Sequence, residues 1–185
     1  MKTHLSALIL GAFALSTPTL AADMAPFGTD EDKAYAALIW DIMEEQKLAG
    51  DDQIHALPYE GIEPHGLMLE TFYSSAEING HSGALIVKRN YGPEGVEADQ
   101  VLADPDKHLG AITVMFKREA GYDADNQDWF WAKYLPDGSL DMNPKGMALA
   151  GRVAKGADKG CIACHAGDDN YIFTTDAPVD KMGMK

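Results

Sequence analysis

The first clear pattern of hydrophobic positions lies at residues 29–50. Apolar side chains recur there at the three- and four-residue spacing of one helix face. Thr29 precedes three acidic residues and is a suitable N-cap, and Gly50 is a suitable C-terminal stop. The pattern predicts one amphipathic helix whose apolar side chains pack on a core: Tyr35, Leu38, Ile39, Ile42 and Met43.

From residue 66 the pattern changes to the two-residue alternation of β-strands. Four segments are alternating or rich in β-branched and aromatic residues, and Gly, Asn and Pro turns separate them. Residues 91–105 are expected to form a loop, and 153–159 a short helical lead. The chain therefore predicts an α+β, mainly β fold: an antiparallel sheet with an N-terminal helix and a C-terminal segment. The predicted strands are 66–74, 84–89, 110–118 and 129–135.

Residues 1–21 have the pattern of a secretory signal peptide. Lys2 and His4 precede an apolar run, Leu5 to Leu15, that is too short to span a bilayer, and small residues surround Ala21. A membrane anchor is the alternative interpretation. The signal predicts cleavage and export to the periplasm, with residues 22–185 as one soluble domain.

The charge of the chain narrows the classes of partner. It carries 15 Lys and Arg against 29 Asp and Glu, a net charge of −14. Such acidity disfavours binding to nucleic acid and, after removal of the signal, to anionic membranes. It favours solubility and would also attract a basic redox protein.

The only two cysteines, Cys161 and Cys164, are followed directly by His165. A Cys-x-x-Cys-His sequence predicts attachment of one haem c: the thiols form thioether bonds to haem, and the histidine is an axial iron ligand. A thioredoxin-like dithiol is an alternative, but it belongs at the start of a helix in a strand–helix–strand unit. A zinc site would need four protein ligands.

Three stretches resemble the cytochrome P-460 family, which includes the cytochromes c′-beta: residues 83–89, 121–134 and 160–174. The resemblance implies a periplasmic, mainly β protein with one haem, usually a homodimer. It also implies binding or redox transformation of a small nitrogen oxide species, nitric oxide or hydroxylamine, at an open distal iron site. Whether the protein turns over a substrate is left open; an electron-transfer cytochrome is the alternative.

The same resemblance marks two strand positions. In the hydroxylamine-oxidising members a lysine is bonded to the haem edge, and Lys88 is the matching residue; otherwise its amine reaches water or a haem propionate. Those members also carry a distal glutamate, where this chain has Thr113. Because neutral threonine is a poor general base, hydroxylamine oxidation is disfavoured. A different strand register would bring Glu119 to that place.

The identity of the sixth iron ligand depends on residues outside the motif. A phenylalanine cap would keep the site open, and Phe72 is the first candidate, ahead of Phe116 and Phe130. An axial methionine would make an electron carrier. Histidines could also be ligands but are expected at the surface. The methionine candidates are Met68, Met115, Met142 and Met147, and the histidines are His55, His65, His81 and His108.

Residues flanking the motif could contact the haem periphery. Arg152, Lys155 and Lys159 are candidate partners of the propionates, or else solvated charges. Tyr171 is expected to pack on the proximal haem face or to bind a propionate, with a plain core role as the alternative.

Overall fold

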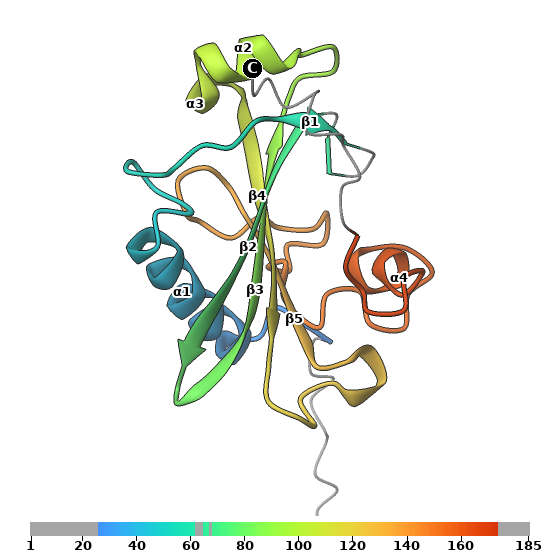
Figure 1. Cartoon of the computed structure of the whole chain (residues 1–185). Helices are drawn as coiled ribbons and strands as arrows, with labels where there is room; N and C mark the ends of the chain where they lie inside the picture. Colours follow the sequence, from blue (N-terminus) through green and yellow to red (C-terminus); the bar gives the residue numbers. More distant parts are fainter. Residues whose placement is uncertain (1–25, 62–64, 67, 174–185) are drawn as a thin grey trace, which may run out of the picture.

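A computed structural model describes residues 26–61, 65–66 and 68–173. One antiparallel sheet with strand order β1-β2-β3-β4-β5-β6 stands at its centre, so the predicted α+β, mainly β fold is confirmed. Helix α1 covers one face and α4 lies beside the other, while α2 and α3 sit at one end (Figure 1). The elements are α1 Asp30–Glu45, β1 Tyr59–Glu60, β2 Met68–Ile78, β3 His81–Tyr91, α2 Ala98–Ala103, α3 Pro105–His108, β4 Leu109–Lys117, η1 Ala124–Asn126, β5 Trp129–Tyr134, β6 Ala150–Gly151 and α4 Cys161–His165.

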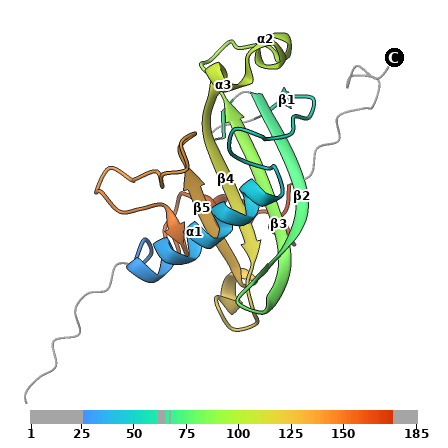
Figure 2. The same cartoon turned by 90° about the vertical axis from the view of Figure 1, so that its left-hand side faces the viewer.

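Helix α1 begins where the sequence predicts. The Thr29 hydroxyl accepts a hydrogen bond from the Asp32 backbone, and the Asp32 carboxylate accepts one from the Thr29 backbone, which forms a capping box. The helix ends at Glu45, earlier than Gly50, because Lys47 takes a positive φ of 58° and turns the chain. Ile39 is fully buried against the sheet, which the helix crosses obliquely (Figure 2).

The β2–β3 hairpin forms the longest strand pair. Its two-residue turn is Asn79–Gly80, both with positive φ, as a hairpin turn of this length prefers. Pairing runs from Ile78↔His81 to Met68↔Tyr91, so both strands are longer than predicted.

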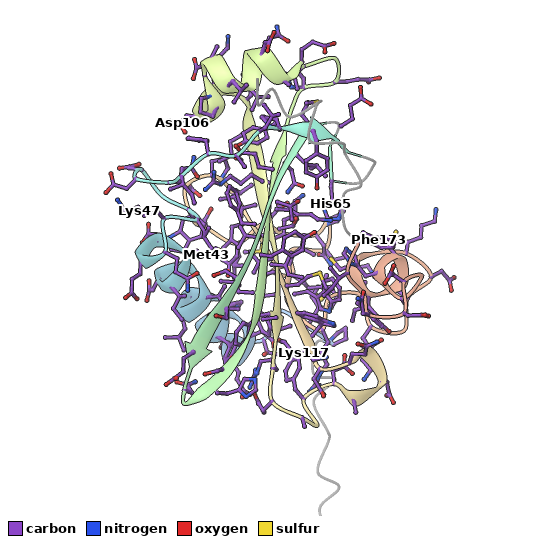
Figure 3. The ribbon with its side chains drawn as sticks, viewed as in Figure 1. Met43, Lys47, His65, Asp106, Lys117 and Phe173 are labelled. Carbon is purple, nitrogen blue, oxygen red and sulfur yellow. The ribbon has the colours of Figure 1, made fainter. Side chains whose placement is uncertain are left out.

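The two faces of the sheet carry different chemistry. In β3, Leu85 and Val87 face α1 and belong to its core, whereas Ile86 packs with the α4 side. Lys88 has the same parity as Ile86, as predicted. Figure 3 shows the separation: Met43 lies on the α1 side, and His65 and Phe173 lie on the α4 side. The α1 face is therefore structural, and the α4 face is available for a site.

Gly83 tests how closely β3 and β4 approach. A Cβ at this position would lie 2.0 Å from the backbone oxygen of Lys117. Gly83→Ala is expected to cost about 1–3 kcal/mol, because the strands must move apart. Gly110→Ala is the matched control, since its Cβ would meet only Asn90 oxygen at 3.5 Å. Urea denaturation measures both, and equal stability of the two variants would contradict the prediction.

Two sequence predictions of local structure are wrong. Residues 91–105 contain α2 and the start of α3, where the Asp104 carboxylate accepts from the Lys107 backbone to cap α3. Residues 153–159 form turns and bends, and the helix begins only at Cys161. The expected signal peptide lies outside the described residues. Among the helices of the described segments, none is both long enough and apolar enough to cross a bilayer.

Candidate functional site

The C-terminal segment brings the three motif residues to one cavity. Cys161, Cys164 and His165 share the five-residue helix α4 and line a cavity of about 620 Å³ on the sheet face away from α1. This volume is within the range of small-molecule and cofactor sites. Much of the remaining wall is apolar, with contributions from Phe27, Leu69, Leu149, Val153 and Phe173.

His165 is buried and held in one orientation. Its Nδ1 donates a hydrogen bond of 2.7 Å to the Tyr171 carbonyl, and a carbonyl can only accept. The rings of Trp131 and Phe173 lie against the imidazole, with centroids 4.8 and 5.3 Å away. Burial lowers the pKa of His165, which favours the neutral ring. Nε2 then carries the lone pair, the arrangement found in metal-binding histidines.

Cys161 has the opposite environment from a redox-active thiol. Burial raises the pKa of Cys161 to about 11, whereas reactive dithiol cysteines have a lowered pKa. The motif also follows bends, not a strand of a strand–helix–strand unit. Across the described segments no cluster of three or more His, Cys, Asp or Glu could hold a metal ion. The dithiol and zinc alternatives thus lack structural support.

The opposite wall of the cavity comes from the sheet and from the residues before β2. Lys88 of β3 pairs across the sheet with Thr113 of β4, and burial lowers the pKa of its amine. The His65 Nδ1 lies 3.3 Å from the Thr113 hydroxyl. The His65 and His165 rings are perpendicular, with centroids 5.9 Å apart. Desolvation, followed by the nearby charge of Lys88, lowers the pKa of His65 to about 4.

The sequence profile of the family described as Cytochrome P460 matches residues 68–174, more than half of the chain. The chain belongs to the cytochrome P460 family. The matched region runs from β2 to just beyond α4, so it includes the cavity wall of the sheet and the haem motif. Membership of the cytochrome P460 family implies a haem cofactor. No curated protein and no solved structure matches the chain significantly.

The residues at this cytochrome P460 site fit a haem. Two thiols and an imidazole with an anchored Nδ1 lie on one helical turn. The cavity beside them has the apolar walls that a porphyrin requires. Lys88 lines the same cavity from the sheet.

The predicted phenylalanine cap is wrong for all three candidates. Phe72 pairs with Val87 and Phe116 pairs with Leu85. Paired residues point to the same face of a sheet, so both phenylalanine side chains lie on the α1 face. Phe130 is fully buried in the same core. Instead of facing a haem, Phe72 lies under the Arg89 guanidinium, 4.7 Å from its ring centroid.

The charged residues that flank the motif do not line either cavity. Arg152 donates to the Tyr122 carbonyl at 2.7 Å and covers the Tyr122 ring, and it lines neither cavity, so the structure gives no support to its assignment to a propionate. Lys155 pairs with Asp123. Glu119 is exposed and forms a salt bridge with Arg118. The register between β3 and β4 pairs Thr113 with Lys88, so Glu119 does not take the place of Thr113. Lys159 is exposed and does not line the cavity.

The Tyr171 side chain is buried in the α4-side cluster, which is the core role given as the alternative prediction. The contact of Tyr171 with the site is made by its backbone carbonyl, which accepts a hydrogen bond from His165 Nδ1. The side chain is buried beside Trp131, with its hydroxyl 3.4 Å from the Asn126 side-chain oxygen. Such a backbone contact gives no signal in the sequence, because any residue has a carbonyl.

The remaining candidates for a sixth iron ligand differ in whether they line the cavity beside His165. Met68 belongs to a separate cluster near α2, Met142 is exposed and Met147 is only packed against the α4-side cluster. Met115 lines only a smaller cavity of about 30 Å³ next to the sheet. His55, His81 and His108 do not line either cavity. His65 lines both, so its expected surface position is wrong.

Some wall residues have no signal in the sequence pattern. Phe27 precedes the first predicted helix, yet it is buried in the α4-side cluster because Gly28 donates to the Ala150 carbonyl and ties the arm to β6. Tyr59 belongs to a two-residue strand too short to predict. Both positions depend on tertiary contacts.

Proposed function

We propose that this cytochrome P460 chain carries one haem c, bonded through thioethers to Cys161 and Cys164, with His165 as an iron ligand. The supporting observation is the hydrogen bond from His165 Nδ1 to the Tyr171 carbonyl, which leaves Nε2 as the free ring nitrogen. When bound, a haem supplies one-electron chemistry and an iron centre for small ligands.

The protein side chains orient and enclose this group. Trp131 and Phe173 pack edgewise on the His165 ring and restrict its rotation. The Tyr73 hydroxyl donates to the Phe173 carbonyl at 3.3 Å, which ties the C-terminal segment back to β2. Apolar residues such as Phe27 and Leu149 limit the access of water.

The same site supports the binding of a small nitrogen oxide, or one-electron exchange with it, over proton-coupled oxidation of hydroxylamine. Thr113 is neutral and cannot accept a proton as a carboxylate does. Glu60 is the one carboxylate among the residues lining the two described cavities, and it is exposed on β1. The family suggests chemistry of nitrogen species, and nitric oxide and hydroxylamine are the proposed ligands.

A two-stage experiment tests this proposal. The protein is produced in a host that matures c-type cytochromes, denatured, and extracted with acidified organic solvent; colour is expected to stay with the polypeptide. Nitric oxide is then expected to change the ferrous spectrum reversibly, without sustained consumption of hydroxylamine. Complete loss of colour contradicts the haem assignment, and hydroxylamine turnover contradicts the preference for binding.

Four further proposals follow from the family resemblance, the expected signal peptide and the charge. We propose that Lys88 is the haem cross-link position; after proteolysis, haem on the Lys88 peptide would support this, and haem only on the Cys161 peptide would oppose it.

We also propose periplasmic export, which cell fractionation checks, and a homodimer, which light scattering checks. The net charge of −14 favours a basic redox partner, which a salt-dependent association rate would reveal.

A further inference from the structure

We propose that His65 is the second axial ligand of the haem iron, opposite His165. The inference rests on the proposed function, because it requires a haem at His165. His65 lies between β1 and β2 and, together with His165 and Lys88, lines both the larger and the smaller cavity. Figure 3 shows it on the α4 side of the sheet.

The spacing of the two imidazoles suits a shared metal. A metal–imidazole nitrogen bond is about 2 Å long, and the ring centre lies about 1 Å behind the nitrogen, so two imidazoles on one metal have centres roughly 6 Å apart. The His65 and His165 centroids are 5.9 Å apart. Their planes are at 90°, and perpendicular planes are compatible with two ligands rotated about a common axis.

Hydrogen bonds orient both rings in the same way. Each imidazole has Nδ1 occupied: His165 by the Tyr171 carbonyl and His65 by the Thr113 hydroxyl, 3.3 Å away. Asn90 Nδ2 donates to the same Thr113 oxygen at 3.3 Å and to the Ala111 carbonyl at 3.1 Å. The Thr113 hydroxyl can donate or accept in its contact with His65 Nδ1; when His65 Nδ1 is the donor, Nε2 is the free nitrogen. Metal-binding histidines typically have such a partner on the other nitrogen.

Thr113 acquires a role under this arrangement. Its neutral hydroxyl is a poor general base, but it can hold an imidazole through a hydrogen bond. We infer that Thr113 and Asn90 are positioning residues for His65.

Other donors are less well placed. Met115 packs with Ile86 and Trp131 against the sheet and does not line the larger cavity. Lys88 lines both cavities, so its amine is the competing ligand that an experiment must distinguish. With His65 bound, iron is six-coordinate, and a small ligand binds only after His65 dissociates.

The test uses the matured haem protein and does not depend on activity. Wild-type protein is expected to be low-spin in both oxidation states, and near-infrared magnetic circular dichroism is expected to show bis-imidazole ligation. His65→Gly is expected to lose the low-spin signal and to regain it with added imidazole. His108→Ala is the control, because His108 lies outside both cavities and is expected to leave the spectrum unchanged.

Several outcomes overturn the inference. A high-spin wild-type spectrum, a histidine–methionine signature, or a low-spin signal that survives His65→Gly but is lost in Lys88→Gln would each exclude His65. The spin state and ligand signature of the wild-type protein test the inference even if the His65 variant fails to fold. If no haem remains on the denatured chain, the proposed function itself fails; if haem remains but iron is high-spin, only the His65 assignment fails.

A Thr113→Val variant separates positioning from ligation. Valine keeps the shape but removes the hydroxyl that holds His65 Nδ1. The low-spin signal is expected to persist while carbon monoxide displaces His65 faster than in wild type. An unchanged rate of displacement by carbon monoxide would contradict the role of Thr113 as a positioning residue for His65.

Discussion

Replacement of both Cys161 and Cys164 by serine, in a Lys88→Gln background that removes the proposed lysine cross-link, is expected to abolish covalent haem retention. The two thiols lie on one turn of α4 at the cavity, and a hydroxyl does not form the thioether bond. His165 keeps its hydrogen bond to Tyr171, so haem can still bind without a covalent link. Acidic organic extraction of the denatured variant is expected to remove all colour from the polypeptide.

The single variants provide the internal control. Cys161→Ser and Cys164→Ser each leave one thiol, so each is expected to retain haem through one bond, with the pyridine haemochrome band shifted to the red by the remaining vinyl group. Folding of the variants is checked by far-ultraviolet circular dichroism. Covalent haem in the double variant that also carries Lys88→Gln would contradict the assignment of both cysteines.

Glu70→Gln is expected to destabilise the fold by about 3–5 kcal/mol, because it leaves the buried Arg89 charge unpaired. Glu70 and Arg89 are 1% and 0% exposed and are joined at 3.0 Å. The Glu70 carboxylate also accepts from the Ala56 backbone and the Tyr91 hydroxyl, so this one group ties the residues before β1 to the sheet. Urea denaturation of the haem-loaded protein measures the loss.

A matched control lies on the same strand. Glu77 is exposed in β2, and Glu77→Gln is expected to change stability by no more than about 0.5 kcal/mol. Because Glu70 lies on the α1 face, Glu70→Gln is expected to leave the haem absorption spectrum of the folded protein unchanged. A changed haem absorption spectrum in fully folded Glu70→Gln protein would contradict the separation between the structural α1 face and the α4 face that holds the site.

The long strands were predictable because their sequences either alternate in polarity or are rich in β-branched and aromatic residues. The alternation in β3 correctly placed Lys88 with Ile86 and opposite Val87. The capping signal at Thr29 was equally local and equally reliable. These features depend on neighbouring residues in the chain, which is why the sequence alone reveals them.

The distal side of the site was not predictable in the same way. Phe72 is an aromatic residue on a predicted strand, but the face it occupies follows from its pairing with Val87 on another strand. His65 was assigned to the surface because Gly and Pro surround it, yet a hydroxyl on β4 and an imidazole on α4 meet it across the fold. The Tyr171 carbonyl was missed because backbone groups leave no compositional signal.

The position of α4 after the last strand has a consequence for biogenesis. All six strands end by Gly151, and the motif segment adds no strand to the sheet. Under the proposed thioether attachment, strand pairing can therefore be completed while both sulfur atoms are still accessible. A chain that has not yet received haem would then have a folded sheet but no colour.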